Sequence, residues 1–297
     1  SDLILEMQKR GCHPTFCPEI ALEERVLPLL DLNELEVFCT VFVAPFQNLR
    51  AAAEIIKSSS IRSKFIVSAS KGIENDTLLL SHEVIADVFT SEVPFAQLSG
   101  PSFASEVMRG LPTAVTVGTS SEELATFLNR LLHHRLFRVY LTDDIVGVEV
   151  GGALKNVIAI ATGISDGLNQ GSNARAALIV RGLGEISRYG QSLGAKRYTF
   201  MGLSGLGDLL LTCSDDQSRN RRFGFALART GNLEDAVNEV GGLVEGFHTA
   251  KALSGTESIN LEEFPVISEI IAILQGYRTP RDSLDRLLSR EATREVS

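Results

Sequence analysis

The sequence predicts an α/β unit followed by an all-helical unit, and three observations support this prediction. Apolar runs of strand length alternate with helix-length segments through the first half of the chain. From about residue 145 to the end, runs of β-branched residues almost disappear and helical segments remain. The change falls at Leu141-Thr142-Asp143-Asp144. Because 297 residues suit about two domains, we expect an α/β domain at 1–143 and an all-α domain at 144–297.

The first half contains the strands of the predicted sheet. Residues 36–45 are an almost continuous apolar run that ends in a turn, which is typical of a buried parallel strand. The segment after it, residues 47–58, carries Leu49 and Ile56 and predicts a helix. This alternation continues and indicates a mostly parallel sheet with helices on both faces. Further strands are predicted at 64–70, 95–99, 113–118 and 137–140, and further helices at 77–90 and 121–133.

The second half predicts helices throughout. Gly202, Gly205 and Gly207 punctuate one of the turns between them. Asp282-Ser283-Leu284 provides a capped start for the last helix. The predicted helices lie at 145–168, 173–192, 205–212, 219–229, 233–239, 246–253, 264–273 and 283–290.

A chain with this organisation normally opens with a strand and a glycine-rich phosphate loop. No G-x-G-x-x-G pattern occurs near the N-terminus, where residues 3–8 predict a helix instead. The spacing from Gly202 to Gly205 lies in the helical half and does not follow a strand, so it is no dinucleotide fingerprint. We therefore expect a Rossmann-like N-terminal domain that lacks its first βαβ unit in this chain.

Composition excludes several classes of partner. The net charge of −9 makes bulk attraction to nucleic acid or to an anionic membrane surface unfavourable. We find no uninterrupted apolar run of about 18 residues and no signal peptide, so we expect a cytoplasmic protein without membrane insertion. Cys12 and Cys17 have C-x4-C spacing, but no further well-spaced ligands follow. We expect free thiols and no metal site.

One lysine indicates a functional pocket. Lys155 interrupts the small and apolar run 151–160, and a lysine is almost never fully buried without a partner. Asp208 supplies a carboxylate in an equally apolar setting, and 217–222 is a dense set of anion-binding groups. Together they suit a small phosphorylated substrate with a reactive carbonyl or hydroxyl carbon. Thr212 follows Asp208 by one helical turn and lies on the same face.

Each of these residues also has a purely structural interpretation. Lys155 could be a helix lysine whose ammonium extends to solvent, and Asp208 could cap a helix. The Thr212 hydroxyl could bond to its own helix. These alternatives remain open from the residues alone.

A set of motifs spans nearly the whole chain and occurs in the order of a known family. With them, the chain resembles bacterial NAD(P)-dependent glycerol-3-phosphate dehydrogenase. The motifs are Ser70–Glu74, Leu98–Glu106, Gly151–Ile160, Ser165–Gly167, Asn173–Leu178, Gly205–Leu209, Leu211–Cys213, Ser218–Phe223 and Val244–Gly246.

The resemblance implies a reaction and a role for each site residue. Hydride would pass reversibly between NAD or NADP and the central carbon of dihydroxyacetone phosphate, with Lys155 as general acid/base and Lys71 and Asp208 as further catalytic residues. It also implies a homodimer that supplies glycerol phosphate for phospholipid synthesis. The implied substrate-binding residues are Lys71, Gly100, Ser102, Lys155, Asn156, Asp208, Thr212, Ser218, Arg219 and Asn220. The implied cofactor-binding residues are Lys71, Ala104, Arg219, Leu243 and Glu245.

Two other functions are compatible with the sequence. One is a related dehydrogenase for a hydroxy acid without phosphate, which would not need Arg219 and Asn220. The other is a non-catalytic fragment that still folds and binds phosphate compounds. Without its first βαβ unit the sheet would expose unpaired backbone edges, so such a fragment should be poorly stable or should associate through that edge.

Overall fold

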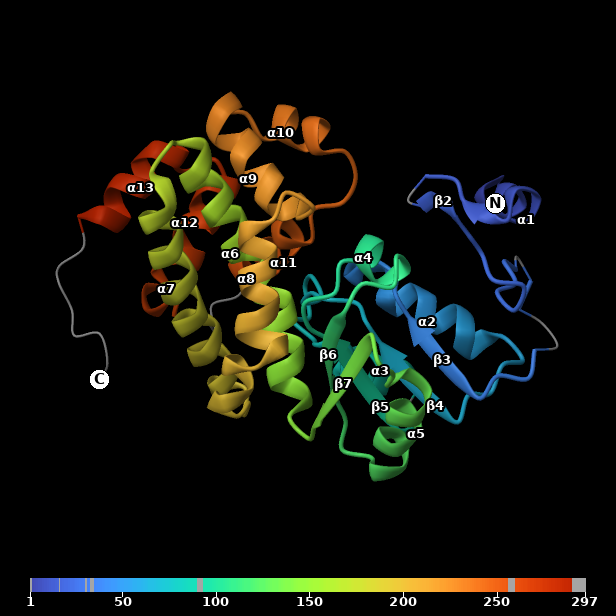
Figure 1. Ribbon diagram of the computed structural model, residues 1–297. Coiled ribbons are helices and arrows are strands. Elements are labelled where there is room, and N and C mark those ends of the chain that lie inside the picture. The colour runs from blue at the N-terminus through green and yellow to red at the C-terminus, as the bar shows by residue number, and fades with distance from the viewer. Residues whose placement is uncertain are drawn as a thin grey trace.

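The computed structural model describes residues 2–15, 17–29, 31–32, 35–89, 93–255 and 260–289. An α/β unit lies beside a helical unit, and α6 (Ile145–Gly167) runs where the two meet (Figure 1). The predicted fold class is therefore confirmed. We propose that the units divide between Asp143 and Asp144. The Asp144 carboxylate caps α6, since its Oδ1 accepts from the Gly147 amide at 2.9 Å.

The α/β unit contains a five-stranded sheet with strand order β3-β4-β5-β6-β7. All neighbouring strands are parallel except β5 and β6, which run antiparallel. The strands are β3 (Cys39–Phe42), β4 (Phe65–Ser68), β5 (Phe95–Ser99), β6 (Thr113–Gly118) and β7 (Phe137–Thr142). The helices between them are α2 (Leu49–Ser58), α3 (Ser81–Phe89), α4 (Ala104–Met108) and α5 (Glu122–Leu132).

Successive side chains along β4 point to opposite faces of the sheet, and helices cover both faces. Ile66 packs with α2 and α3 on one face, whereas Phe65 and Val67 pack with α5 on the other. All four residues of β4 are buried. The predicted two-sided covering is confirmed.

The N-terminal residues form a separate small structure. α1 (Asp2–Arg10) agrees with the predicted helix, and β1 (Cys12–His13) pairs antiparallel with β2 (Cys17–Ala21) in a two-stranded sheet. Of the described residues before Cys39, none joins the five-stranded sheet. Cys12, Cys39 and Cys213 are free thiols, and the Cys17 side chain lies outside the described part of the chain.

The helical unit is built around α6. Nearly all of α6 from Gly147 to Ser165 is buried, and it packs closely on α9 because glycines on both helices remove the side chains that would separate them. The other α-helices are α7 (Gly171–Ser192), α8 (Asp208–Ser214), α9 (Arg219–Thr230), α10 (Leu233–Val240), α11 (Glu245–Ser254), α12 (Pro265–Leu274) and α13 (Pro280–Leu288). Shorter turns are η1 (Phe46–Asn48), η2 (Arg197–Met201), η3 (Leu203–Gly207) and η4 (Leu261–Glu263).

Within the described ranges, α6 is the one helix long and apolar enough to cross a membrane. Its most apolar stretch is 89% buried inside the protein, and helices in a protein core can have the same length and composition. The helix carries Glu149 and Lys155, so it contains no uninterrupted apolar run of about 18 residues.

Several predicted boundaries are wrong, each for a local reason. α3 begins at Ser81 rather than near residue 77, because Asp76 and Leu78 have positive φ angles of 68° and 62°. α13 begins at Pro280, since Thr279 and Asp282 form a capping box. The two-stranded sheet of β1 and β2 and the short helix α4 were not predicted.

Two further predicted segments differ in length or type. The strand predicted at 36–45 is confined to β3, whose neighbours Phe38 and Val43 are exposed at the edge of the sheet. The helix predicted at 205–212 is a π-helical turn, η3, followed by α8.

Candidate active site

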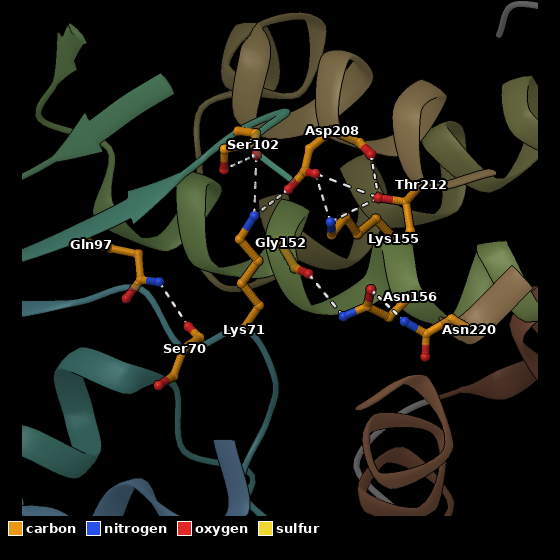
Figure 2. A network of polar contacts seen from close by, with 11 residues as sticks. Ser70, Lys71, Gln97, Ser102, Gly152, Lys155, Asn156, Asp208, Thr212 and Asn220 are labelled. Atoms are coloured by element: carbon orange, nitrogen blue, oxygen red, sulfur yellow. Dashed lines mark hydrogen bonds and ion pairs between the residues drawn. The ribbon is translucent and has the colours of Figure 1, made fainter. Parts of the chain in front are cut away.

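Lys155 is buried in the middle of α6 and has two oxygen partners. Its side chain points toward α8, where Nζ lies 2.6 Å from Asp208 Oδ1 and 2.8 Å from Thr212 Oγ1 (Figure 2). The residue is only 7% exposed. The ammonium group therefore does not reach out to solvent, and burial of its charge is offset by a carboxylate.

Asp208 joins the two units of the chain. Its Oδ2 lies 2.7 Å from Lys71 Nζ, which also donates to the Gly100 carbonyl oxygen at 3.2 Å. Lys71 follows β4, whereas Asp208 begins α8, and the two lysines approach the carboxylate from different sides (Figure 2). The Asp208 side chain thus bonds two ammonium groups, and Gly207 rather than Asp208 is the N-cap of α8.

Burial and charge set the protonation of this cluster. Burial, with repulsion from the Lys71 ammonium, lowers the pKa of Lys155 to about 8, although Asp208 opposes the shift. Burial alone would raise the pKa of Asp208, but the ammonium groups of Lys155 and Lys71 hold it below its usual value. A carboxylate that stays ionised beside a lysine that titrates near neutral pH suits proton transfer.

Local backbone geometry brings the cluster together. A side chain at Gly151 would lie 2.6 Å from the Ser204 carbonyl oxygen, so only glycine lets the π-helical turn before Asp208 approach α6. A side chain at Gly152 would lie 2.9 Å from Ser99 Oγ and 3.4 Å from Lys71 Cγ. The two glycines before Lys155 therefore allow η3 on one side and the segments that carry Ser99 and Lys71 on the other to pack close to α6.

A second chain of hydrogen bonds connects three helices beside the cluster. Asn220 Nδ2 on α9 donates to Asn156 Oδ1 on α6 at 2.9 Å (Figure 2). Asn220 Oδ1 accepts from the Gly246 amide on α11 at 2.8 Å. Ser218 Oγ caps α9 by accepting from the Arg221 amide at 3.2 Å. Asn220 is thus fixed at the start of α9.

Arg219 and Glu245 lie at the edge of this network. Arg219 is exposed, and its Nη1 is the nearest atom to a side chain built on Gly242, at 3.1 Å. Glu245 Oε1 accepts from the Phe46 amide at 3.1 Å, while Oε2 is buried without a hydrogen-bond partner among the described residues. Burial raises the pKa of Glu245, and Arg219 opposes the shift.

The remaining predicted residues occupy the turn after β5 and the segment before α11. Gly100 has a φ of 131° and lies against the backbone of β6, a position that excludes a side chain. Ser102 Oγ donates to the Gly100 carbonyl at 3.1 Å. Ala104 begins α4 and is exposed, and Leu243 is half-buried before α11. Neither Ala104 nor Leu243 belongs to the hydrogen-bonded network, because their side chains are apolar.

Two buried polar groups near the cluster were missed. Gln97 is 1% exposed, and its Nε2 donates to the Ser70 carbonyl at 2.9 Å (Figure 2). Ser99 is fully buried, and its hydroxyl has no partner among the described residues. The available signal was the placement of polar residues at the carboxyl end of a buried strand, where α/β sheets bind ligands.

Comparison with known proteins identifies the family to which the chain is related. Two family models match, described as the N-terminus and the C-terminus of NAD-dependent glycerol-3-phosphate dehydrogenase, at residues 1–125 and 144–285. A glycerol-3-phosphate dehydrogenase [NAD(P)+] from Legionella pneumophila (strain Paris) is 40% identical over 289 residues, which is 97% of this chain and 88% of the relative. One from Nitrosococcus oceani is 44% identical over 95% of this chain and 83% of the relative.

Solved structures agree with this relationship. The crystal structure of glycerol-3-phosphate dehydrogenase from Coxiella burnetii has a TM-score of 0.89 and 37% identity, covering 98% of this chain and 89% of that one. The chain belongs to the NAD-dependent glycerol-3-phosphate dehydrogenase family.

Proposed function

We propose that the protein is an oxidoreductase that interconverts dihydroxyacetone phosphate and sn-glycerol 3-phosphate with NAD(P)(H). The names of its relatives support this reaction. The single observation in this chain that carries the proposal is the buried cluster of Lys155, Asp208 and Lys71. A carbonyl reduction needs a proton donor and positive charge at the oxygen, and this cluster offers both.

Lys155 is the proposed general acid/base. Bound nicotinamide would supply or accept the hydride at the substrate's central carbon. The Lys155 ammonium would stabilise the negative charge that develops on the carbonyl oxygen and then donate its proton there. In the reverse direction the neutral amine would accept the hydroxyl proton. A pKa of about 8 allows both forms near neutral pH.

Asp208 and Lys71 are proposed to prepare that lysine. Asp208, with Thr212, holds the Lys155 ammonium in one orientation. Lys71 keeps Asp208 ionised and provides a second positive charge from the α/β unit, close to where substrate would lie. Because each unit contributes one lysine, the reactive carbon would be bound where the units meet.

The start of α9 is proposed to bind the substrate phosphate. A helix N-terminus favours an anion, and the Arg219 guanidinium can donate paired bonds to phosphate oxygens. Ser218 and Asn220 are fixed by the cap and by the bonds to Asn156 and Gly246. Gly100 and Ser102 would contact the substrate from the opposite side.

The residues present fit a nicotinamide cofactor. Glu245 Oε2 is a buried carboxylate oxygen without a partner among the described residues, beside the segment that follows β3. This segment lies at the carboxyl ends of parallel strands, where such sheets bind ligands. The residues that would hold NAD or NADP are Lys71, Ala104, Arg219, Leu243 and Glu245.

The proposed biological setting rests on the family alone. We propose a cytoplasmic homodimer that supplies glycerol phosphate for phospholipid synthesis. Sedimentation of the purified protein would measure the dimer directly.

The proposed reaction is tested by NADH and NADPH oxidation with dihydroxyacetone phosphate and with dihydroxyacetone. Wild type should use the phosphorylated ketone, Lys155→Ala should lose roughly 10²–10⁴-fold in kcat, and Arg219→Ala should lose its preference for phosphate. Arg222→Ala, an exposed position on the same helix as Arg219, is the matched control. Full activity of Lys155→Ala would refute the acid/base role. An equal rate with dihydroxyacetone would favour a dehydrogenase for substrates without phosphate.

A further inference from the structure

The short helix α4 is poorly held by packing. It has five residues, none of them buried, and no side chain caps its first turn. Yet it begins at Ala104, two residues after Ser102, and these two residues are proposed to touch cofactor and substrate respectively. Whatever fixes α4 therefore also fixes one side of the proposed binding site.

A glutamine from the helical unit bonds to two successive residues of this helix. Ser105 Oγ donates to Gln217 Oε1 at 2.5 Å, and Gln217 Nε2 donates to Glu106 Oε1 at 3.0 Å. Both ends of one amide are engaged, and each end has the polarity that its partner needs.

Gln217 is itself held in the loop that connects α8 to α9. Its backbone amide donates to Asp215 Oδ1 at 2.8 Å, and the Ser218 amide donates to the Asp215 carbonyl at 3.1 Å. Ser218 then caps α9, which carries Arg219 and Asn220. The same four-residue loop thus carries the Gln217 side chain and leads directly into the proposed phosphate site.

We propose that Gln217 is a positioning residue that joins the two sides of the substrate site. Through its bonds to α4 it links the Ser102–Ala104 segment of the α/β unit to the start of α9 at Ser218–Asn220, without touching the substrate. This inference rests on the proposed function for its kinetic consequences. The phosphorylated end of the substrate would lie between these two segments.

The test exchanges the polarity of the bridge. Gln217→Glu places a carboxylate against Glu106 and should raise KM for dihydroxyacetone phosphate about three- to tenfold, with kcat changed far less. Glu106→Gln alone should have little effect, because its amide oxygen still accepts from Gln217. The double variant Glu106→Gln/Gln217→Glu restores a donor–acceptor pair and should recover most of the lost KM.

Hydrogen exchange of the α4 amides separates this proposal from the proposed activity. Gln217→Glu should accelerate exchange at residues 104–108, and the double variant should slow it again, whether or not the protein turns over this substrate. An unchanged KM and unchanged exchange in Gln217→Glu would overturn the bridge. So would a double variant that is no better than the single one. Restored exchange in a protein inactive on dihydroxyacetone phosphate would support the bridge and reject the proposed reaction.

Discussion

At the scale of single residues, the titration of Lys155 gives a pH prediction with a definite sign. The lysine is protonated below its pKa of about 8 and neutral above it. Ketone reduction needs the proton, so its kcat/KM should fall about tenfold per pH unit above 8. Alcohol oxidation needs the neutral amine, so its kcat/KM should fall by the same factor per unit below 8. Initial rates in both directions from pH 6 to 10 measure this.

A matched variant identifies the titrating group. Lys251→Gln changes an exposed lysine on α11 and should keep both profiles. The arginine in Lys155→Arg holds its proton at every pH tested. The kcat/KM of any residual alcohol oxidation should therefore no longer change near pH 8. Profiles that are flat between pH 7 and 9 in the wild type would contradict the assignment of Lys155.

The contacts of Lys155, Lys71 and Asp208 show what the sequence could and could not predict about the site. A lysine inside an apolar run requires a counter-charge, and this requirement predicted the contact between Lys155 and Asp208. The contact between Lys71 and Asp208 spans 137 residues and depends on how the two units meet. No local pattern contains that arrangement. Gln97 and Ser99, whose buried side-chain oxygens are unpaired among the described residues, differ in this respect, because their place at the carboxyl end of a buried strand was a local signal.

At the level of helices and strands, periodicity predicted the order of the five sheet strands and of most helices, but where each element ends depends on side chains. The start of α13 needs the Thr279 hydroxyl bond to the Asp282 amide, which an apolar pattern does not contain. The π-helical turn before Asp208 arises where η3 packs against Gly151 of α6, a tertiary contact. The antiparallel pairing of β5 with β6 is likewise a property of topology.

A buried glutamate and a half-buried histidine join two elements and predict a stability effect. Glu149 of α6 accepts from the His82 amide at 2.8 Å, and its other oxygen lies 2.6 Å from His82 Nδ1, at the start of α3. Glu149→Ala removes both bonds and leaves partly buried donors unpaired, so it should lower the free energy of unfolding by about 1–3 kcal/mol. Urea denaturation measures this loss.

The control for that prediction lies on α3, the helix that carries His82. Asp87 pairs with Arg50 on the exposed side of α3, where an ion pair contributes little. Asp87→Ala should therefore change the unfolding free energy less than Glu149→Ala does. Equal losses in the two variants would show that Glu149 does not hold α3 to α6.

At the scale of the whole molecule, the site exists only where the two units meet. The α/β unit supplies Lys71 and the backbone amide of Phe46, and the helical unit supplies Asp208 and Glu245. Any ligand bound there would contact both units and stabilise their arrangement. Each unit alone therefore carries an incomplete set of the proposed catalytic groups.

Glu245 tests whether that arrangement matters for cofactor binding. Glu245→Ala removes the acceptor for the Phe46 amide and should raise KM for NADH about three- to tenfold, with a smaller effect on KM for dihydroxyacetone phosphate. Glu245→Gln keeps an oxygen acceptor, so it should recover most of that loss if the bridge is what matters. Glu262→Ala, an exposed position in η4, should leave both KM values unchanged. If Gln fails as badly as Ala, the carboxylate charge itself serves the cofactor; if both KM values rise together, Glu245 holds the two units in place for both ligands.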